Sequence, residues 1–376
     1  MNILTCCTTD NKPNFKKEKH GYRCSICGKF YPFLQIKHKD KLIDPKELSK
    51  FTGKVFKYKK SAVAFFNDHY YAQRKNTLLK IEIDESHQSH QCDTIRIMSN
   101  VYHIAISPDE KYAITETFSG TLEVIDLLKK EAVARKGKCP VNGAFIFTDN
   151  QEILYAYSKA IRCWNFLQNT DTVVWEVPTD WMKNEKGELK YNAVCTNVIY
   201  NPHKQCYLFQ FSVATNSYIV AAHNKQVIWQ KRFDHVPTRS KLVYSEGINQ
   251  YTLSKSNKVT IYDEELCAVK SIVSPSLFRI SDGGGMFPIT KLEPHCPDMV
   301  YISMDGKWIL LNYFTSAIMM RISDQKILFC LFSYDGKVAQ NMGFIDDSYF
   351  WYTWGDTTYI QEIAEEKSVY NKEERL

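Results

Sequence analysis

The stretch VYHIAISPDEKYAITETFSGTLEVIDLLKKEAVARK, residues 101–136, decides the fold of this chain. Four segments of it have the β-branched and aromatic composition of strands, namely 101–107, 112–117, 121–126 and 131–136. Pro108-Asp-Glu-Lys111 separates the first two segments and Ser119-Gly120 the next two, and such pairs reverse a chain between strands. The stretch therefore predicts one antiparallel sheet of four short strands.

The same order of strands and turns recurs on both sides of this stretch. Further units are expected at 62–83, 143–177, 197–233, 241–273, 299–332 and 338–363. The first turns of successive units are 41, 40, 53, 44, 59 and 41 residues apart, as marked by Asp68, Asp109, Asp149, Pro202, Glu246, Asp305 and Asp346. Four of these gaps match the period of a four-stranded propeller blade, which is about 40–45 residues.

This spacing predicts an all-β fold, a seven-bladed β-propeller of four-stranded antiparallel blades. One sheet with two apolar faces is poorly stable by itself, whereas seven sheets in a ring bury those faces against one another. The seventh unit has only three strands, so we expect its fourth strand to precede the first unit, with Lys54–Lys59 or Phe33–Lys37 as candidates. The alternative architecture is a large antiparallel β-sandwich.

The two long gaps between units coincide with loops at 178–192 and 274–297, and the second loop contains Gly283-Gly284-Gly285. Insertions between blades are expected on one face of a propeller, often the binding face.

The repeated units resemble the blades of the WD40 family. Ser107-Pro-Asp-Glu-Lys-Tyr112 and Ser303-Met-Asp-Gly-Lys-Trp308 match the Ser-Pro-Asp-Gly-Lys turn after the first strand of such a blade. Val124-Ile-Asp126, Cys163-Trp-Asn165 and Thr260-Ile-Tyr-Asp263 stand where the family has its Trp-Asp dipeptide, but no true Trp-Asp occurs there and the family's Gly-His is missing. The resemblance covers residues 54–365 and implies a protein that binds macromolecules and catalyses no reaction.

Composition indicates a soluble globular protein, with 44% hydrophobic and 24% charged residues among 376. Aromatic residues make up 14%, which favours strands. The sequence shows no signal peptide and no uninterrupted run of the ~18 apolar residues that a membrane helix needs. The cysteines are scattered and several lie in predicted strands, which indicates a reducing, cytoplasmic location without a disulfide framework. These strand cysteines are Cys163, Cys195, Cys206 and Cys330.

Positive charge is concentrated at the N-terminus. Residues 1–60 contain 15 Lys and Arg against 5 Asp and Glu, a net charge of +10, so the rest of a chain of net charge +6 sums to −4. This asymmetry predicts a basic N-terminal module at 1–50, a propeller at 51–365 and a charged tail at 366–376.

The N-terminal segment contains Cys24-Ser-Ile-Cys27-Gly-Lys, the spacing of a zinc knuckle. Two thiolates on one tight turn can face one metal, and a structural zinc site needs four ligands. A short, lysine-rich module has little core of its own, so zinc would order it. The remaining two ligands are expected among Cys6, Cys7, His20 and His38, and the alternative is a pair of ordinary thiols in a basic arm.

Lysines and aromatic residues alternate in the same segment. With Phe30, Tyr31 and Phe33 between them, the lysines suit contacts with nucleic-acid phosphates and bases. The alternative is a solvated, solubilising surface. The lysines concerned are Lys16, Lys17, Lys19, Lys37, Lys39 and Lys41.

No catalytic signature is present, whether a nucleophile elbow, a phosphate-binding loop or a metalloprotease helix. Large apolar side chains in the two insertions are the better indication of function, because such residues are enriched at protein interfaces. The residues expected to bind a partner are Trp181 and Met182 in the first insertion and Phe278, Met286 and Phe287 in the second.

The sequence thus predicts a cytoplasmic, non-catalytic scaffold that presents propeller loops to a protein partner as a subunit of a complex, without membrane contact. A nucleic-acid-associated protein that uses the zinc-binding module is the alternative. A propeller hydrolase or lyase with a site in the central channel is a weaker one, since fold does not give function.

Overall fold

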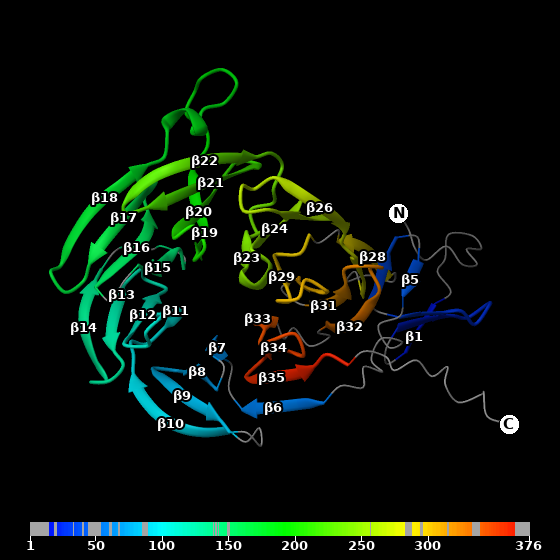
Figure 1. Ribbon diagram of the computed structural model, residues 1–376. Coiled ribbons are helices and arrows are strands. Elements are labelled where there is room, and N and C mark those ends of the chain that lie inside the picture. Colours follow the sequence, from blue (N-terminus) through cyan, green and yellow to red (C-terminus); the bar gives the residue numbers. More distant parts are fainter. Residues whose placement is uncertain are drawn as a thin grey trace.

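Seven four-stranded antiparallel sheets form a ring in the computed structural model (Figure 1). The structure describes residues 15–18, 21–32, 34–39, 41–43, 54–59, 62–66, 68–84, 89–137, 139, 141, 143–148, 151–255, 257–282, 288–293, 296–313, 316–332 and 339–364. The first strand of each sheet lies nearest the centre of the ring and the fourth lies at the rim. This arrangement confirms the predicted seven-bladed propeller.

Blades 1 to 4 follow one another along the chain. Blade 1 contains β7 (Ala62–Phe65), β8 (His69–Arg74), β9 (Thr77–Ile83) and β10 (Ser89–Arg96). Blade 2 contains β11 (Val101–Ile106), β12 (Tyr112–Thr117), β13 (Leu122–Asp126) and β14 (Glu131–Lys136). Blade 3 contains β15 (Phe145–Phe147), β16 (Glu152–Tyr157), β17 (Ala160–Asn165) and β18 (Thr170–Glu176). Blade 4 contains β19 (Ala193–Asn201), β20 (Cys206–Val213), β21 (Asn216–His223) and β22 (Gln226–Phe233).

Blades 5 to 7 complete the ring. Blade 5 contains β23 (Val243–Ser245), β24 (Gln250–Lys255), β25 (Lys258–Tyr262) and β26 (Ala268–Val273). Blade 6 contains β29 (Met299–Ile302), β30 (Trp308–Asn312), β31 (Ser316–Arg321) and β32 (Ile327–Phe332). Blade 7 contains β33 (Ala339–Phe344), β34 (Tyr349–Trp354), β35 (Thr357–Glu362) and, from the N-terminal side of blade 1, β6 (Val55–Lys59).

The ring is closed by β6, which pairs with β35 from Lys59 opposite Thr357 to Val55 opposite Gln361. Of the two candidates for a closing strand, Lys54–Lys59 is confirmed. Tyr58 of β6 is buried and packs with Tyr70 of blade 1. Closure by an N-terminal strand therefore joins the two ends of the repeat through both hydrogen bonds and core packing.

The Ser-x-Asp turn has the same hydrogen bonds in blades 2 and 6. The Ser107 hydroxyl donates to the Asp109 carboxylate at 2.8 Å, and the same oxygen, Asp109 Oδ1, accepts the Lys111 N–H at 3.2 Å. The Ser303–Asp305 hydroxyl–carboxylate distance is 2.7 Å and the corresponding N–H bond is 3.0 Å. The side chains thus satisfy backbone groups of the turn, which explains why these residue types recur.

Adjacent blades are also joined by buried polar side chains. Gln210 of blade 4 donates to the Ser240 carbonyl at 2.7 Å and accepts the Leu242 N–H at 2.7 Å, just before blade 5. Thr252 of blade 5 donates to the Val300 carbonyl in blade 6 at 2.5 Å. Because these side chains are buried, each bond satisfies a group that water cannot reach.

Apolar side chains from the middle strands fill the spaces between blades. Trp164, Phe209, Tyr251 and Phe350 are fully buried there, whereas the fourth strands β14, β22 and β26 are mostly exposed. Among the described residues, helix is limited to the short 3-10 turns η1 (Thr179–Met182) and η2 (Glu246–Ile248). None of the helices in this part of the chain has the length and apolar character to cross a membrane.

An eighth sheet lies beside the ring and combines distant parts of the chain. Its order is β28 (Pro288–Glu293), β27 (Ser276–Asp282), β4 (Leu34–His38) and β5 (Lys41–Ile43), and Figure 1 shows β28 and β5 next to blades 5 and 6. Ile36 of β4 is fully buried among the side chains of these two blades. The candidate Phe33–Lys37 is therefore wrong as a closing strand, because this segment fills an apolar gap between blades instead.

A separate three-stranded sheet contains β1 (Phe15–Glu18), β2 (Gly21–Cys24) and β3 (Phe30–Pro32). The hairpin between β2 and β3 includes the two cysteines of the knuckle motif.

Acid is expected to weaken the fold through the Ser-x-Asp turns. Partial burial would raise the pKa of Asp109 and Asp305, but hydrogen bonds from the serine hydroxyl, the following N–H and a lysine ammonium outweigh it and lower both pKa values. Because the folded pKa is the lower one, these carboxylates stabilise the fold above the unfolded pKa of about 3.9, and the contribution is lost as pH falls through the folded pKa.

The measurement is the urea concentration at the unfolding midpoint, determined at several pH values from about 6 down to about 3. The double variant Asp109→Asn, Asp305→Asn is expected to be less stable at the higher pH and to lose less on acidification. An equally steep decline in the variant and the original protein would contradict this explanation.

Candidate interaction surface

Both insertions emerge on one face of the ring. Each connects the fourth strand of a blade to the first strand of the next, β18 to β19 and β26 to β29, and these connections share a face with the turns between second and third strands. We call this the insertion face, and the face with the remaining turns the opposite face. The shared location agrees with the prediction that insertions gather on one side of the propeller.

An aromatic ridge crosses the insertion face at blade 2. Phe118, in the turn after β12, is 75% exposed and stacks on Tyr102, with ring centroids 4.5 Å apart and an interplanar angle of 10°. The Tyr102 and His103 rings lie 4.2 Å apart. Burial, and secondarily the Glu116 carboxylate, raise the pKa of Tyr102 to about 12. The ridge therefore presents one fully accessible aromatic ring on a preordered support.

The inner end of this ridge is fixed by Glu116 and Gly143. The fully buried Glu116 carboxylate accepts the backbone N–H groups of Val141 at 2.7 Å and Gly143 at 2.8 Å, which lead into blade 3. Gly143 has a φ of +75°, and a Cβ there would lie 2.9 Å from His103 Nδ1. Only glycine combines this backbone conformation with such close packing on the His103 ring.

A groove of about 300 Å³ lies next to the ridge, between blades 3 and 4. Its walls include the apolar side chains of Val141, Val194 and Phe211, and Lys159 supplies a cation. Val194 is 45% exposed. Ser158 and Asn192 add polar groups, so the groove offers both apolar and polar contacts.

Trp181 and Met182, near the start of the first insertion, pack against the propeller, whereas residues 185–190 are exposed. Trp181 stacks on Tyr218 with ring centroids 3.9 Å apart, and Met182 is only 5% exposed within the core of blades 3 and 4. This packing removes Met182 from the exposed surface on which its predicted role in partner binding depended. Leu189, at 67% exposed, is instead the apolar side chain that this insertion presents to solvent.

The second insertion supplies β27 and β28 of the eighth sheet. Phe278 lies in β27, opposite Gln35 of β4 and Leu292 of β28. Met286 and Phe287 lie outside the described residues. The roles of Phe278, Met286 and Phe287 in partner binding stay predictions.

The residues from Cys24 to Gly28 form a tight turn. The Gly28 N–H donates to the Cys24 carbonyl at 3.0 Å, the Cys24 N–H donates to the Lys29 carbonyl at 2.9 Å, and Gly28 has a φ of +74°. Cys24 is buried and Cys27 is exposed. Gly28 thus allows a tight turn after the two cysteines, and the zinc knuckle stays a prediction.

The described residues do not bring a third ligand to these cysteines. No group of three or more His, Cys, Asp or Glu side chains among them is placed to hold a metal ion. His38 is buried in β4, on the eighth sheet, and Cys6, Cys7 and His20 lie outside the described residues. Zinc therefore stays a prediction that depends on residues the structure does not describe.

The basic residues of the N-terminal segment are divided between two sheets. Lys16 and Lys17 belong to β1, whereas Lys37 and Lys41 belong to β4 and β5, with Lys39 in the turn between them. Lys16, Lys37 and Lys39 are exposed, and Lys19 lies outside the described residues. The six lysines thus do not belong to one element.

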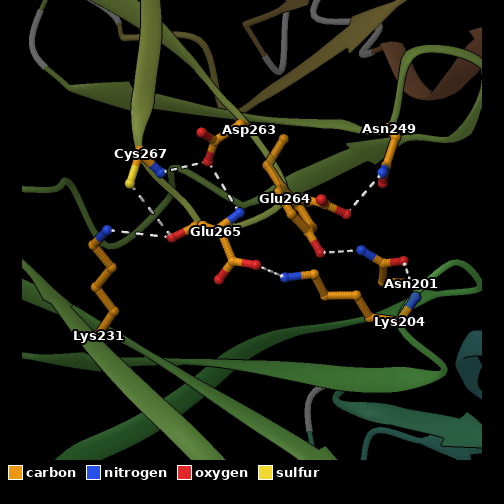
Figure 2. Close-up of polar contacts among 9 residues, drawn as sticks. Asn201, Lys204, Lys231, Asn249, Asp263, Glu264, Glu265 and Cys267 are labelled. Carbon is orange, nitrogen blue, oxygen red and sulfur yellow. Dashed lines mark hydrogen bonds and ion pairs between the residues drawn. The ribbon is translucent and has the colours of Figure 1, made fainter.

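The opposite face is joined by charged contacts, as Figure 2 shows for blades 4 and 5. Lys204 of blade 4 forms an ion pair with Glu265 of blade 5, and Lys231 donates to the Leu266 carbonyl at 2.7 Å. Asp263 accepts the Cys267 N–H at 2.8 Å, which orders the turn that presents Glu265. These groups have partners within the protein, so this region serves the fold.

Solved structures of propellers resemble this ring. The β-propeller domain of Myceliophteria thermophila Cps50 (Swd1) has a TM-score of 0.56 and 9% identity, over 83% of this chain and 98% of that one. The C-terminal WD40 domain of Sif2 has a TM-score of 0.53 and 11% identity, over 83% and 99%. The chain has a WD40-type β-propeller fold. No family model and no curated protein matches its sequence.

Sequence reasoning missed several residues of the insertion face of this WD40-type ring. Phe118 could have been recognised from the sequence, because it is an aromatic residue between a predicted strand and a predicted Ser-Gly turn. Glu116 and Gly143 gave no signal, since their importance depends on the contact between one WD40-type blade and the next.

Proposed function

We propose that this protein is a non-catalytic scaffold that binds a protein partner through the insertion face of its propeller, as a cytoplasmic subunit of a complex. The observation that carries the proposal is Phe118, a large aromatic side chain that is 75% exposed yet held by stacking on Tyr102. Aromatic anchors beside a groove are the residues that contribute most to protein interfaces. A preordered anchor also loses little conformational entropy on binding.

The fold of the solved structures supports the same proposal only in general terms, because identities of 9% and 11% extend to architecture alone. The nucleic-acid alternative, the zinc-binding module and the weaker enzyme alternative remain predictions. No contact among the described residues favours any of them over a protein scaffold.

Replacing Phe118 with Ser is expected to reduce partner recovery at least tenfold with no loss of fold, because the side chain is mostly in water. The measurement is quantitative mass spectrometry after affinity purification from the native cell. Leu128→Ser is the matched control, since Leu128 is 87% exposed in the same blade but on the opposite face. Equal loss of partners in both variants, or in neither, would reject the insertion face as the binding surface.

A further inference from the structure

The inner rim of the insertion face contains a lysine just before the first strand of blade 5. Lys241 precedes β23, the first strand of blade 5, and its N–H donates to the Asp298 carbonyl at 2.8 Å. Its ammonium contributes to lowering the pKa of His103, a change due mainly to burial. His103 lies on the first strand of blade 2, across the ring in Figure 1, so Lys241 lies at the mouth of the central channel.

The Lys241 ammonium is a half-buried cation without an ion pair. No carboxylate of the described residues lies within ion-pair distance of it, and Asp298 and Cys195 act on it only through longer-range electrostatics. Burial lowers the pKa of Lys241, and burial likewise raises the pKa of Cys195 to about 12, so this neighbour stays a neutral thiol. A partly desolvated cation without a counter-charge is less stable than a fully hydrated one, and a carboxylate would relieve that cost.

Exposed charge in the turns between second and third strands, on the insertion face, is mostly positive. The turns between second and third strands contain one acid and several bases, namely Asp356 against Arg74, Lys75, Lys159 and Lys255. The turns of the opposite face are rich in acids, among them Asp84, Asp109, Glu110, Glu246, Asp263, Glu264, Glu265, Asp305, Asp324, Asp346 and Asp347. In the connections from one blade to the next, exposed acids and bases are balanced, with Asp180, Glu185, Glu188 and Asp234 against Lys183, Lys186, Lys190 and Arg239. The turns between second and third strands therefore give the insertion face its basic character, which complements an acidic partner.

Lys241 lies near the groove between blades 3 and 4. Cys195 lines that groove and also interacts electrostatically with Lys241. Lys159 lines the same groove, beside the apolar Val194. A segment that lay in the groove could thus place apolar side chains against its walls and carboxylates near both lysines.

We infer that the insertion face binds an acidic segment of a protein partner, with a carboxylate of that segment paired to Lys241 at the mouth of the central channel and another to Lys159 in the groove. This inference rests on the proposed function and adds the chemistry of the partner. A nucleic acid would instead contact many exposed cations through its phosphates. Here the unpaired cation is half buried near a groove with both apolar and polar lining, which suits side chains of a peptide.

The test uses the full chain and a fluorescein-labelled peptide in which Glu and Asp alternate with Leu and Phe, measured by fluorescence anisotropy. We expect binding that weakens at least tenfold in Lys241→Met, is retained in Lys241→Arg, and is lost for the same peptide with Gln and Asn in place of the acids. Lys129→Met is the control, because Lys129 is exposed on the opposite face. Met fits a half-buried site, so the thermal midpoint of Lys241→Met should not fall.

Three outcomes would overturn the inference: no binding of the acidic peptide, equal binding by Lys241→Met and the original protein, or tighter binding of a single-stranded oligonucleotide that depends on Lys241. Failure of the inference is distinguishable from failure of the proposed function. If the acidic peptide does not bind but Phe118→Ser still loses its cellular partners, the scaffold stands and the partner chemistry is wrong.

Discussion

Replacing Ile36 with Asp is expected to detach the eighth sheet from the propeller and to lower the free energy of unfolding by about 4 kcal/mol, the size typical of burying an unpaired charge. Ile36 has no exposed surface and packs against Val259, Ile272 and Ile318 in blades 5 and 6. A carboxylate at this position would have only hydrocarbon around it. The measurement is the urea midpoint together with limited proteolysis N-terminal to β6.

Lys37→Asp is the matched control for this prediction. Lys37 is the next residue of β4, is exposed, and pairs through its backbone with Ser276 and Leu42 like its neighbours. The same new charge on the solvent side of one strand should change stability by less than about 0.5 kcal/mol. If both variants lose the same stability, the burial of Ile36 between blades 5 and 6 does not hold β4 in place.

The eighth sheet also marks the limit of what the sequence predicts. The blades could be found because each is local, with strand patterns and turn residues that recur at a regular period. The closing strand could be found because the seventh unit lacked one strand. Pairing of β4 with β27 joins residues 34–37 to residues 276–279. Nothing in the sequence of either segment indicates that it pairs with the other. Such long-range pairing depends on a gap between two blades that exists only in the folded ring.

The candidate site was predictable to a similar degree. Sequence spacing placed both insertions, and topology agrees that they share a face. The choice of side chains was harder, because an apolar residue in a loop is equally compatible with exposure and with packing on the rim. Met182 packs inward, while Phe118, in the four-residue turn between β12 and β13, remains exposed. Lys241 could not be recognised, since its surroundings depend on residues that are distant in sequence, such as Cys195 and Asp298.

The first turns of blades 5 and 6 are in close contact, and a substitution there is expected to have the second large effect on stability. Gly247, in η2 at the first turn of blade 5, is expected to tolerate no side chain, and Gly247→Ala should cost about 2–3 kcal/mol of stability. A Cβ there would lie 2.6 Å from Met304 Cα and 2.7 Å from the Met304 carbonyl oxygen, in the first turn of blade 6. These are backbone atoms, so the blades must separate to relieve the overlap. The measurement is the urea midpoint at neutral pH.

Gly137→Ala separates this effect from the ordinary consequences of replacing glycine. A Cβ at Gly137 would have no heavy atom within 4 Å, so its stability should change by less than about 0.5 kcal/mol. The double variant Gly247→Ala, Met304→Ala gives the sharper discrimination. If a flexible side chain were the obstacle, shortening Met304 would restore stability; because the closest atom is a Cα, the double variant should remain as unstable as Gly247→Ala alone, and recovery would show that the two blades are not in backbone contact.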